Sequence, residues 1–194
     1  MLLLVYTWPY ALFFWGAFIW VFAAEVRVVS GPSGPAVTPY DAHSKRLILV
    51  GQGLALFAAF GIAARLRSAT LTHRVVWFWI GFGAMIAGGL LRRHCKRMLG
   101  SNFTGAVIVK TQQTVVNRGA YRYVRHPSYT AGLILFIGVG LALGNWLSLL
   151  VLALVVGLVY GYRVHVEERA LLAVVGDPYR RYMIKTQRFV PFLF

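Results

Sequence analysis

Acidic residues are the scarcest chemical class in this chain of 194 residues, with five Asp and Glu against 20 Lys and Arg. Charged residues of both signs make up 13% of the sequence, about half of what soluble globular domains carry. Hydrophobic residues make up 59%, and the mean hydropathy is +0.67. This balance excludes a soluble globule and indicates an integral membrane protein of a single domain, residues 1–194.

A formal net charge of +15 is also found in nucleic-acid-binding proteins. Here, however, the basic residues cluster at the ends of apolar runs, where they anchor a protein to anionic lipid headgroups. The sequence therefore predicts membrane lipids as partners and no nucleic acid.

Cysteine and histidine are scarce as well. A single cysteine, Cys95, excludes an intramolecular disulfide framework. Metal ligation by His126, His165, Glu167 and Glu168 is conceivable, but membrane di-iron enzymes need many more histidines than the five in this chain. The prediction is that no metal is bound.

The apolar runs predict an all-α membrane protein with five transmembrane helices, because about 20 apolar residues cross the hydrocarbon layer. The runs cover residues 2–24, 47–64, 75–91 and 131–162. Gly144 and Asn145 break the last run into two arms, which predicts a tight helical hairpin. Gly138 and Gly140 on one arm, and Gly157 and Gly161 on the other, suggest close antiparallel packing. The third run is rich in small residues, which also permits close helix packing in lipid.

Basic residues set the expected orientation. With the basic stretch 92–97 on the cytoplasmic side, 17 of the 20 Lys and Arg lie inside, and three, Arg65, Arg67 and Arg74, lie outside. The amino terminus is then outside and the carboxyl terminus cytoplasmic. Residues 1–99 form three amino-terminal spans, and residues 100–194 form the remaining core.

The polar segments between and after the spans lie on the same cytoplasmic side in this arrangement. Residues 101–125 contain β-prone pieces at 106–109 and 114–116 and should fold over the mouth of the bundle. After a stop at Gly176 and Pro178, residues 179–185 read as a basic amphipathic helix, and residues 192–194 could dip into the interface.

Two polar stretches flank the predicted hairpin. Residues 126–129 precede it and residues 163–168 follow it, so both return to one side of the membrane. On a helix, Arg163 and Glu167 share a face, as do His165 and Glu168. Ionisable groups at a bilayer edge are costly unless paired or used. The residues alone predict a polar cofactor or headgroup site, with a helix-end salt bridge as the plainer alternative.

The stretch QTVVNRGAYRYVRHPSY (residues 113–129), followed after a hairpin by RVHVEE (residues 163–168), resembles the isoprenylcysteine carboxyl methyltransferase family. The tail segments GDPYRRY (176–182) and RFVP (188–191) are similar to that family's tail. The resemblance covers roughly residues 100–194 and is that of a short, prokaryotic-type member.

This resemblance implies an enzyme that transfers a methyl group from S-adenosylmethionine to the carboxylate of a lipidated, prenyl-type cysteine, leaving S-adenosylhomocysteine. Carried over residue by residue, Arg163 contacts substrate. The implied cofactor-binding residues are Gln113, Thr114, Val115, Val116, Tyr121, His126, Pro127, Ser128, Tyr129 and Glu167. Gln113 replaces a histidine common in the family, and Lys110 and Gln112 are further candidates.

Other functions remain open from the sequence. A methyltransferase of the same architecture could act on a phospholipid amine or another amphiphile. An NADPH-dependent membrane reductase is a second alternative, because sterol reductases share a related carboxyl-terminal half. A non-enzymatic lipid-binding scaffold is the third.

Overall fold

The computed structural model of the protein describes residues 2–30, 43–100, 103, 107, 109 and 115–190, and for residues 27–30 it describes the backbone alone. Within these residues the regular structure is helical, with two isolated β-bridges, Thr70 to Asn145 and Val124 to Gln187. The α-helices are α1 (Tyr10–Ser30), α2 (Ser44–Arg65), α3 (Arg74–Leu99), α4 (Pro127–Leu143), α5 (Trp146–Val174) and α6 (Asp177–Lys185). Short 3-10 helices are η1 (Leu4–Tyr6), η2 (Arg67–Ala69) and η4 (Gly119–Arg122).

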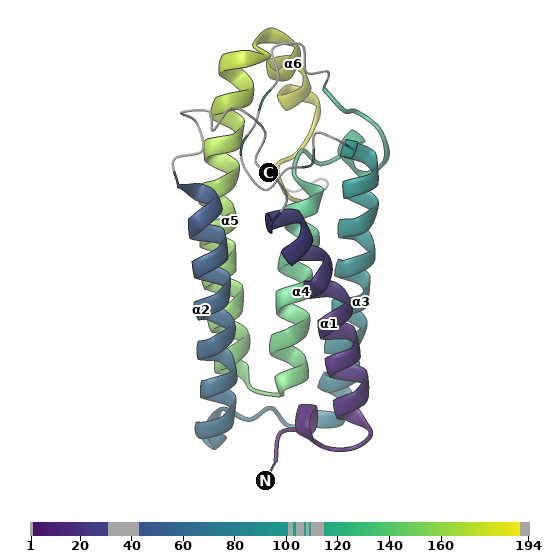
Figure 1. Ribbon diagram of the computed structural model, residues 1–194, viewed down its shortest axis with the longest axis vertical. Helices are drawn as coiled ribbons and strands as arrows, with labels where there is room; N and C mark the ends of the chain where they lie inside the picture. Colours follow the sequence, from purple (N-terminus) through teal and green to yellow (C-terminus); the bar gives the residue numbers. More distant parts are fainter. Residues whose placement is uncertain are drawn as a thin grey trace.

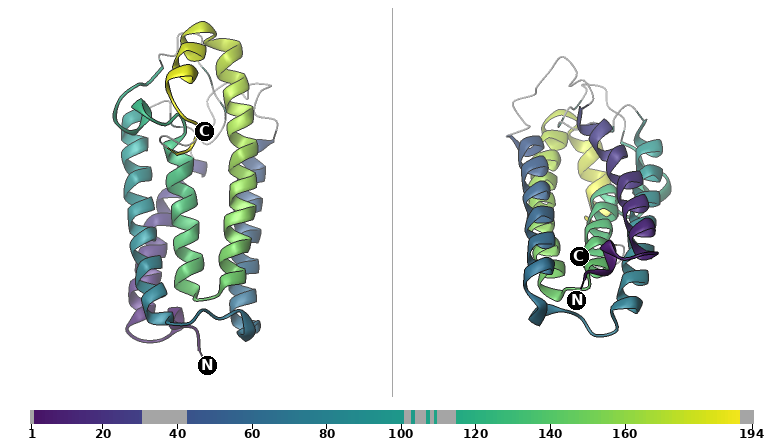
Figure 2. Two further views of the ribbon diagram at one scale, coloured as in Figure 1. Left: turned by 180° about the vertical axis from the view of Figure 1, so that it is seen from behind. Right: turned by 60° about the horizontal axis from the view of Figure 1, so that its bottom comes forward.

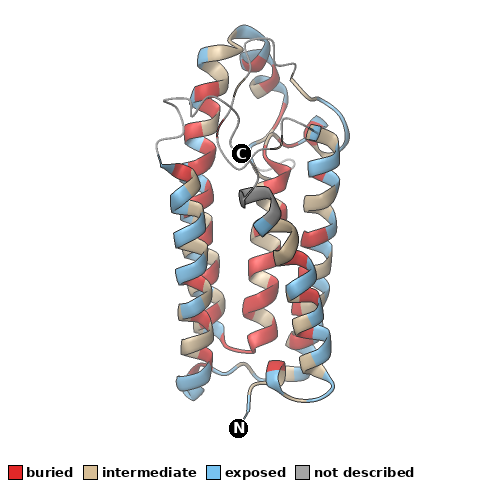
Figure 3. Ribbon diagram, in the orientation of Figure 1, coloured by how far each residue is buried: buried red, intermediate tan, exposed pale blue. Residues whose placement is uncertain are grey.

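The five long helices run alongside one another as an elongated bundle, with α6 at one end and the amino-terminal segment at the other (Figure 1). Helix α4 packs most extensively on α3, and α2 packs most extensively on α5. Figure 3 shows that α4 is buried over much of its length, whereas α2 is largely exposed or intermediate. The central position of α4 matters because its first turn carries the residues of the predicted site.

The amino-terminal helix begins later than the sequence predicts. The apolar run from residue 2 predicts one continuous helix, but α1 begins at Tyr10 and runs to Ser30. Pro9 explains the difference, because a proline disfavours helical backbone in the residue before it and is tolerated at a helix start. The preceding residues fold back on the helix, where the Trp15 indole Nε1 donates to the Val5 carbonyl at 2.9 Å.

Helix α3 extends further than predicted at its carboxyl end. It continues through the basic stretch 92–97 to Leu99 instead of ending at residue 91. Arginine and lysine are good helix formers, and cations in a last turn interact favourably with the helix dipole. Gly100, with φ of 54°, then ends the helix.

A short turn joins α4 to α5, and the two helices run in opposite directions side by side (Figure 2). Gly144 adopts a left-handed conformation with φ of 66°, and the Asn145 side chain accepts a hydrogen bond from the Ser148 backbone N at 3.0 Å. Gly144 therefore ends α4 and Asn145 caps the start of α5, at the break that the sequence predicts.

The glycines of α3 and α4 bring these helices into close contact. A Cβ on Gly81 would lie 2.5 Å from the Gly138 carbonyl oxygen, and one on Gly88 would lie 2.7 Å from the Ala131 carbonyl oxygen. The small residues of the third run thus include close packing sites, as expected. Gly140 also approaches α5, where a Cβ would lie 2.7 Å from Leu149 Cα.

The expectation for the α5 glycines is wrong. Among the described residues, no neighbouring atom lies within 4 Å of a Cβ added at Gly157 or Gly161, and Gly138 packs on α3 instead of α5. The arm containing α4 has two neighbours, and sequence alone could not assign each glycine to one of them.

Helices α2, α3 and α5 are long and apolar enough to cross a membrane, while Tyr10–Val26 and Pro127–Leu143 are shorter apolar helices. Helix α5 and α6 are separated by Gly176 with φ of 69°, close to the predicted stop. Two sequence-based expectations lie outside the described residues: the segment 192–194 and about half of the β-prone pieces. Within those pieces, Val107, Val109, Val115 and Val116 are described without strand structure.

Candidate functional site

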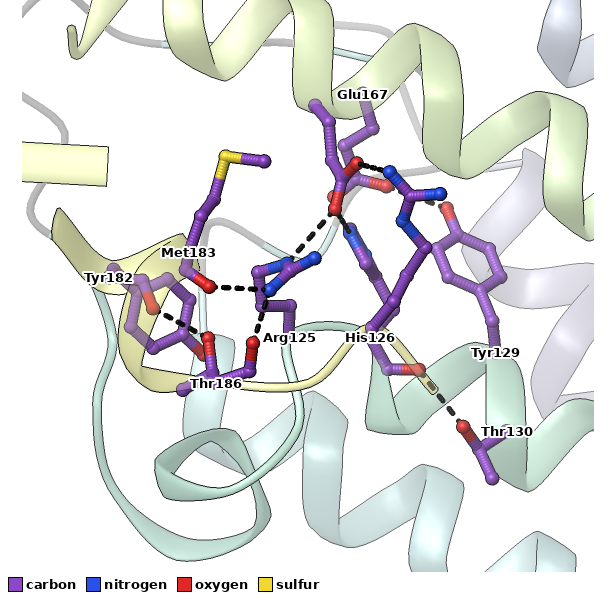
Figure 4. A network of polar contacts seen from close by, with 10 residues as sticks. Arg125, His126, Tyr129, Thr130, Glu167, Tyr182, Met183 and Thr186 are labelled. Atoms are coloured by element: carbon purple, nitrogen blue, oxygen red, sulfur yellow. Dashed lines mark hydrogen bonds and ion pairs between the residues drawn. The ribbon is translucent and has the colours of Figure 1, made fainter. Parts of the chain in front are cut away.

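The start of α4 meets the last turns of α5 at the end of the bundle that carries α6. Pro127 occupies the first helical turn of α4, where its missing N–H costs nothing. The preceding side chains, Arg125 and His126, point toward the same carboxylate on α5 (Figure 4). Two stretches more than 30 residues apart in the sequence therefore form one polar cluster.

Glu168 is the centre of this cluster. Its carboxylate accepts from Arg125 Nε at 3.0 Å and from Arg188 Nη2 at 2.7 Å, and it lies 3.2 Å from His126 Nε2. The residue is 4% exposed, so the surrounding cations offset the cost of burying its charge.

The same cluster fixes the carboxyl-terminal segment. The Arg125 N donates to the Gln187 carbonyl at 2.7 Å, and the His126 N donates to the Arg188 carbonyl at 3.1 Å. The Thr130 hydroxyl donates to the Phe189 carbonyl at 2.7 Å. Residues 187–189 are thereby held across the start of α4.

The expected pairing of His165 with Glu168 is wrong. His165 is exposed, whereas Glu168 is buried and turned toward the arginines and His126. A three-residue spacing leaves two side chains about 60° apart around a helix axis, which is enough to separate a buried residue from an exposed one. Arg125 and Arg188 were missed as partners because no spacing rule links them to α5.

Tyr129 connects two further polar residues of α5, Arg163 and Glu167. Its hydroxyl donates to Glu167 Oε2 at 2.9 Å and accepts from Arg163 Nε at 3.2 Å. Arg163 is 3% exposed and also donates to the Ser44 hydroxyl at the start of α2. Arg163 and Glu167 thus share a face of α5, as the spacing predicts, and the phenol of Tyr129 contacts both.

Tyr129, Arg163 and Glu167 line one cavity of about 360 Å³. Eight of the predicted residues line it, and Pro127 does not: the lining includes the polar Tyr121, His126, Ser128, Tyr129, Arg163 and Glu167 and the apolar Val115 and Val116. Apolar side chains of α1 and α2 line another part, among them Phe22, Ile48, Leu49 and Leu56. The predicted residues Gln113 and Thr114, and the candidates Lys110 and Gln112, lie outside the described residues.

Tyrosine hydroxyls near the cavity stay protonated at neutral pH. Burial raises the pKa of Tyr121, and the neighbouring Cys95 and Glu167 raise this pKa further. Burial likewise raises the pKa of Tyr182 to about 12. Tyr182 donates its hydroxyl to the Tyr121 carbonyl at 2.6 Å. The Tyr121 hydroxyl is buried beside Cys95, and no hydrogen-bond partner of ordinary geometry contacts it among the described residues.

Several cavity residues come from the amino-terminal half, which the sequence did not connect with the site. Glu25 on α1, Gln52 on α2 and Arg92 on α3 all line it, and Gln52 donates to the Tyr160 hydroxyl at 2.8 Å. One feature of the sequence could have indicated this. Glu25 lies at the edge of an apolar run and Gln52 lies within one, where polar groups are costly. In the described part of the chain, no group of three or more His, Cys, Asp and Glu residues is arranged to hold a metal ion.

Comparison with known proteins supplies the family. A model of the isoprenylcysteine carboxyl methyltransferase family matches residues 79–173. A probable protein-S-isoprenylcysteine O-methyltransferase of Oryza sativa subsp. indica is 26% identical over 185 residues, covering 90% of this chain and 96% of that protein. The chain belongs to the isoprenylcysteine carboxyl methyltransferase family.

Other relatives of this methyltransferase family cover less of the chain or of their own length. The protein-S-isoprenylcysteine O-methyltransferase of Schizosaccharomyces pombe is 33% identical over 113 residues, which is 57% of this chain and 48% of that protein. A solved structure of a eukaryotic intramembrane Ras methyltransferase has the same fold, with a TM-score of 0.62 and 22% identity over 97% of this chain and 70% of its own. The chain is therefore an integral membrane protein whose described residues fold into helices.

Proposed function

We propose that this protein is an S-adenosylmethionine-dependent methyltransferase that methylates the carboxylate of a prenylated cysteine or a similar lipophilic acceptor. The observation that supports this most is the composition of one cavity. Arg163, Tyr129 and Glu167 meet in its wall, and apolar side chains of α1 and α2 continue that wall. A site for a polar cofactor is thus joined to a site for an apolar tail.

The polar wall fits the cofactor. Glu167 offers a carboxylate for the ammonium group of the methionine part, and His126 and Tyr129 can hydrogen-bond its polar groups. The buried hydroxyl of Tyr121 offers a further donor, and Val115 and Val116 offer apolar contact. When bound, S-adenosylmethionine supplies an electrophilic methyl group on a sulfonium.

Arg163 is suited to hold the acceptor. A carboxylate is already ionised near neutral pH, so alignment of the nucleophile contributes more to the rate than a general base. The guanidinium is planar and can bind a carboxylate through two parallel hydrogen bonds. Contacts to Ser44 and Tyr129 fix its orientation before the acceptor arrives. Arg163 therefore contacts substrate in this proposal.

The apolar lobe is suited to the acceptor's tail. It extends along α2 from Lys45 to Leu56, a distance of about 16 Å at the helical rise. Aromatic rings join its two helices: Phe22, which lines the cavity, stacks on Phe18 of α1 with ring centroids 4.3 Å apart, and Phe60 of α2 meets Phe18 edge-on at 6.3 Å. A lipophilic chain of similar length would fill the lobe. The names of the relatives make a prenyl chain the first candidate.

The proposed membrane arrangement has five crossings, α4 and α5 forming a helical hairpin, and the site facing the cytoplasm. The division of basic residues into 17 and three supports this orientation. Reporter fusions after Ala24, Ala64, Leu91 and Phe194 should report inside, outside, inside and inside. An external carboxyl terminus would refute the hairpin.

The function is tested by ligand binding and by methyl transfer. The purified protein in detergent should bind S-adenosylhomocysteine in the calorimeter with a chelator present. It should also transfer methyl groups to a prenylated cysteine analogue. Transfer to a phospholipid amine alone would move the assignment to another amphiphile. No heat with S-adenosylhomocysteine and clean titration with NADPH would replace it with a reductase.

A further inference from the structure

Three helices converge at Arg92, one turn after a pair of glycines on α3. A Cβ on Gly88 would lie 2.7 Å from the Ala131 carbonyl oxygen of α4. A Cβ on Gly89 would lie 2.9 Å from the Val21 side chain of α1. Because α1 and α4 approach α3 this closely, the Arg92 side chain, one turn further along α3, reaches both helices.

The Arg92 guanidinium divides its donors between these two helices. Nε and Nη2 bind the two carboxylate oxygens of Glu25 on α1, with Nη2 to Oε2 at 2.6 Å. Nη1 donates to the carbonyl oxygen and to the hydroxyl of Ser128 on α4, each at 2.9 Å. Four of the five guanidinium N–H donors are thereby used. The side chains of Arg92 and Glu25 are 15% and 25% exposed, so the pair is largely shielded from water.

Ser128 lies in the first turn of α4, immediately before Tyr129. The Tyr129 hydroxyl contacts both Glu167 and Arg163, at 2.9 and 3.2 Å, and those distances depend on how this turn is rotated about its axis. Two hydrogen bonds from one rigid guanidinium to the backbone and side chain of Ser128 fix that rotation. Glu25 in turn fixes the guanidinium.

We infer that Arg92, oriented by Glu25, is a positioning residue that holds the first turn of α4 so that Tyr129 reaches Glu167 and Arg163. This inference rests on the proposed methyl transfer. It gives α1 a part in the reaction, since Glu25 is the contact through which α1 acts on the site.

Arg92 also lines the cavity, as do Arg125 and Arg163, and this invites another interpretation, that Arg92 binds the acceptor carboxylate. Its position argues against this. The Nε–Nη2 edge of the guanidinium, which could bind a carboxylate through two hydrogen bonds, already binds both oxygens of Glu25. Arg92 therefore acts through Ser128, and the acceptor falls to Arg163.

The test is Arg92→Lys with Arg97→Lys as its matched control. Lysine keeps the charge opposite Glu25, but a single ammonium cannot reproduce a planar fork that spans Glu25 and Ser128. We expect kcat to fall roughly 10- to 100-fold, because small displacements of reacting groups are costly. Affinity for S-adenosylhomocysteine should fall about tenfold. KM for the prenylated cysteine analogue should stay within about twofold, since the acceptor-binding residues are unchanged. Arg97 is exposed on the same helix, and its lysine variant should match wild type.

A charge-reversed pair separates positioning from stability. Glu25→Arg combined with Arg92→Glu keeps an ion pair between α1 and α3 but removes the donors to Ser128. We expect this double variant to melt at a higher temperature than Arg92→Glu alone while kcat stays low. Recovery of kcat in the double variant, or an Arg92→Lys enzyme equal to the Arg97→Lys control, would overturn the inference. A wild-type protein without methyl transfer or cofactor binding would instead remove the proposed function itself.

Discussion

Replacing Glu167 with glutamine should weaken cofactor binding with little effect on the fold. Glutamine keeps the shape of the side chain and can still accept the Tyr129 hydrogen bond, which measures 2.9 Å in the native protein. What is lost is the negative charge opposite the cofactor's ammonium. Losing a partly desolvated charged partner costs about 2 to 4 kcal/mol. The dissociation constant of S-adenosylhomocysteine, measured by calorimetry in detergent, should therefore rise roughly 30- to 700-fold.

Arg163→Ala should behave in the opposite way. Cofactor affinity should stay within a few fold, while kcat falls by about a hundredfold or more because the acceptor carboxylate is no longer aligned. Arg163→Lys should restore little, since a point charge does not replace two parallel hydrogen bonds. Thermal unfolding belongs in the same experiment, because Arg163 also contacts Ser44 and Tyr129.

The comparison between the two variants decides the matter. If Arg163 and Glu167 only hold helices together, both substitutions should lower the melting temperature slightly. Neither should then change ligand affinity or turnover. Arg169→Ala, at an exposed position on the same helix, controls for removing a cation from α5. Equal and mild effects in the two test variants would show that a structural contact had been mistaken for an active site.

Three further outcomes follow from the packing. Glu168→Gln should cost about 3 to 5 kcal/mol of unfolding free energy, visible as a lower melting temperature, because it leaves the largely buried Arg125 without its anion. Gly132→Ala should cost about 1 to 3 kcal/mol, since its Cβ would lie 2.4 Å from the Tyr160 hydroxyl, whereas Gly157→Ala, with nothing within 4 Å, should be tolerated. Gly53→Leu places a side chain in the apolar lobe, so KM for the lipophilic acceptor should rise while S-adenosylhomocysteine affinity, measured in parallel, stays unchanged.

The part of the site carried by α4 and α5 follows from the sequence for a simple reason. An apolar run broken once by Gly144 and Asn145 must return to the side on which it began, so residues 126–129 meet residues 163–168. This argument needs chain length and turn chemistry alone. It identifies neither the partner of each side chain nor its rotation, which is why His165 was paired with Glu168.

The contribution of the first three helices could not be derived in the same way. Ser44 meets Arg163 across 119 positions of the sequence, and Gln52 meets Tyr160 across 108. No periodicity states which helix of a bundle lies beside which, because that choice depends on the packing of small residues such as Gly81 and Gly88. Glu25 accordingly looked like the end of a span when it was in fact part of the cavity wall.

Each of the few carboxylates near the site has a distinct set of contacts. An ionised carboxylate near the edge of a bilayer is costly unless a cation compensates it. Glu25 is bound by Arg92, and Glu168 is bound by Arg125 and Arg188. Glu167 accepts from the neutral phenol of Tyr129 and lines the cavity. Among the described residues, Glu167 is the one of these three carboxylates without a cation within salt-bridge distance, so in the proposed function its charge is the one that pairs with the cationic cofactor.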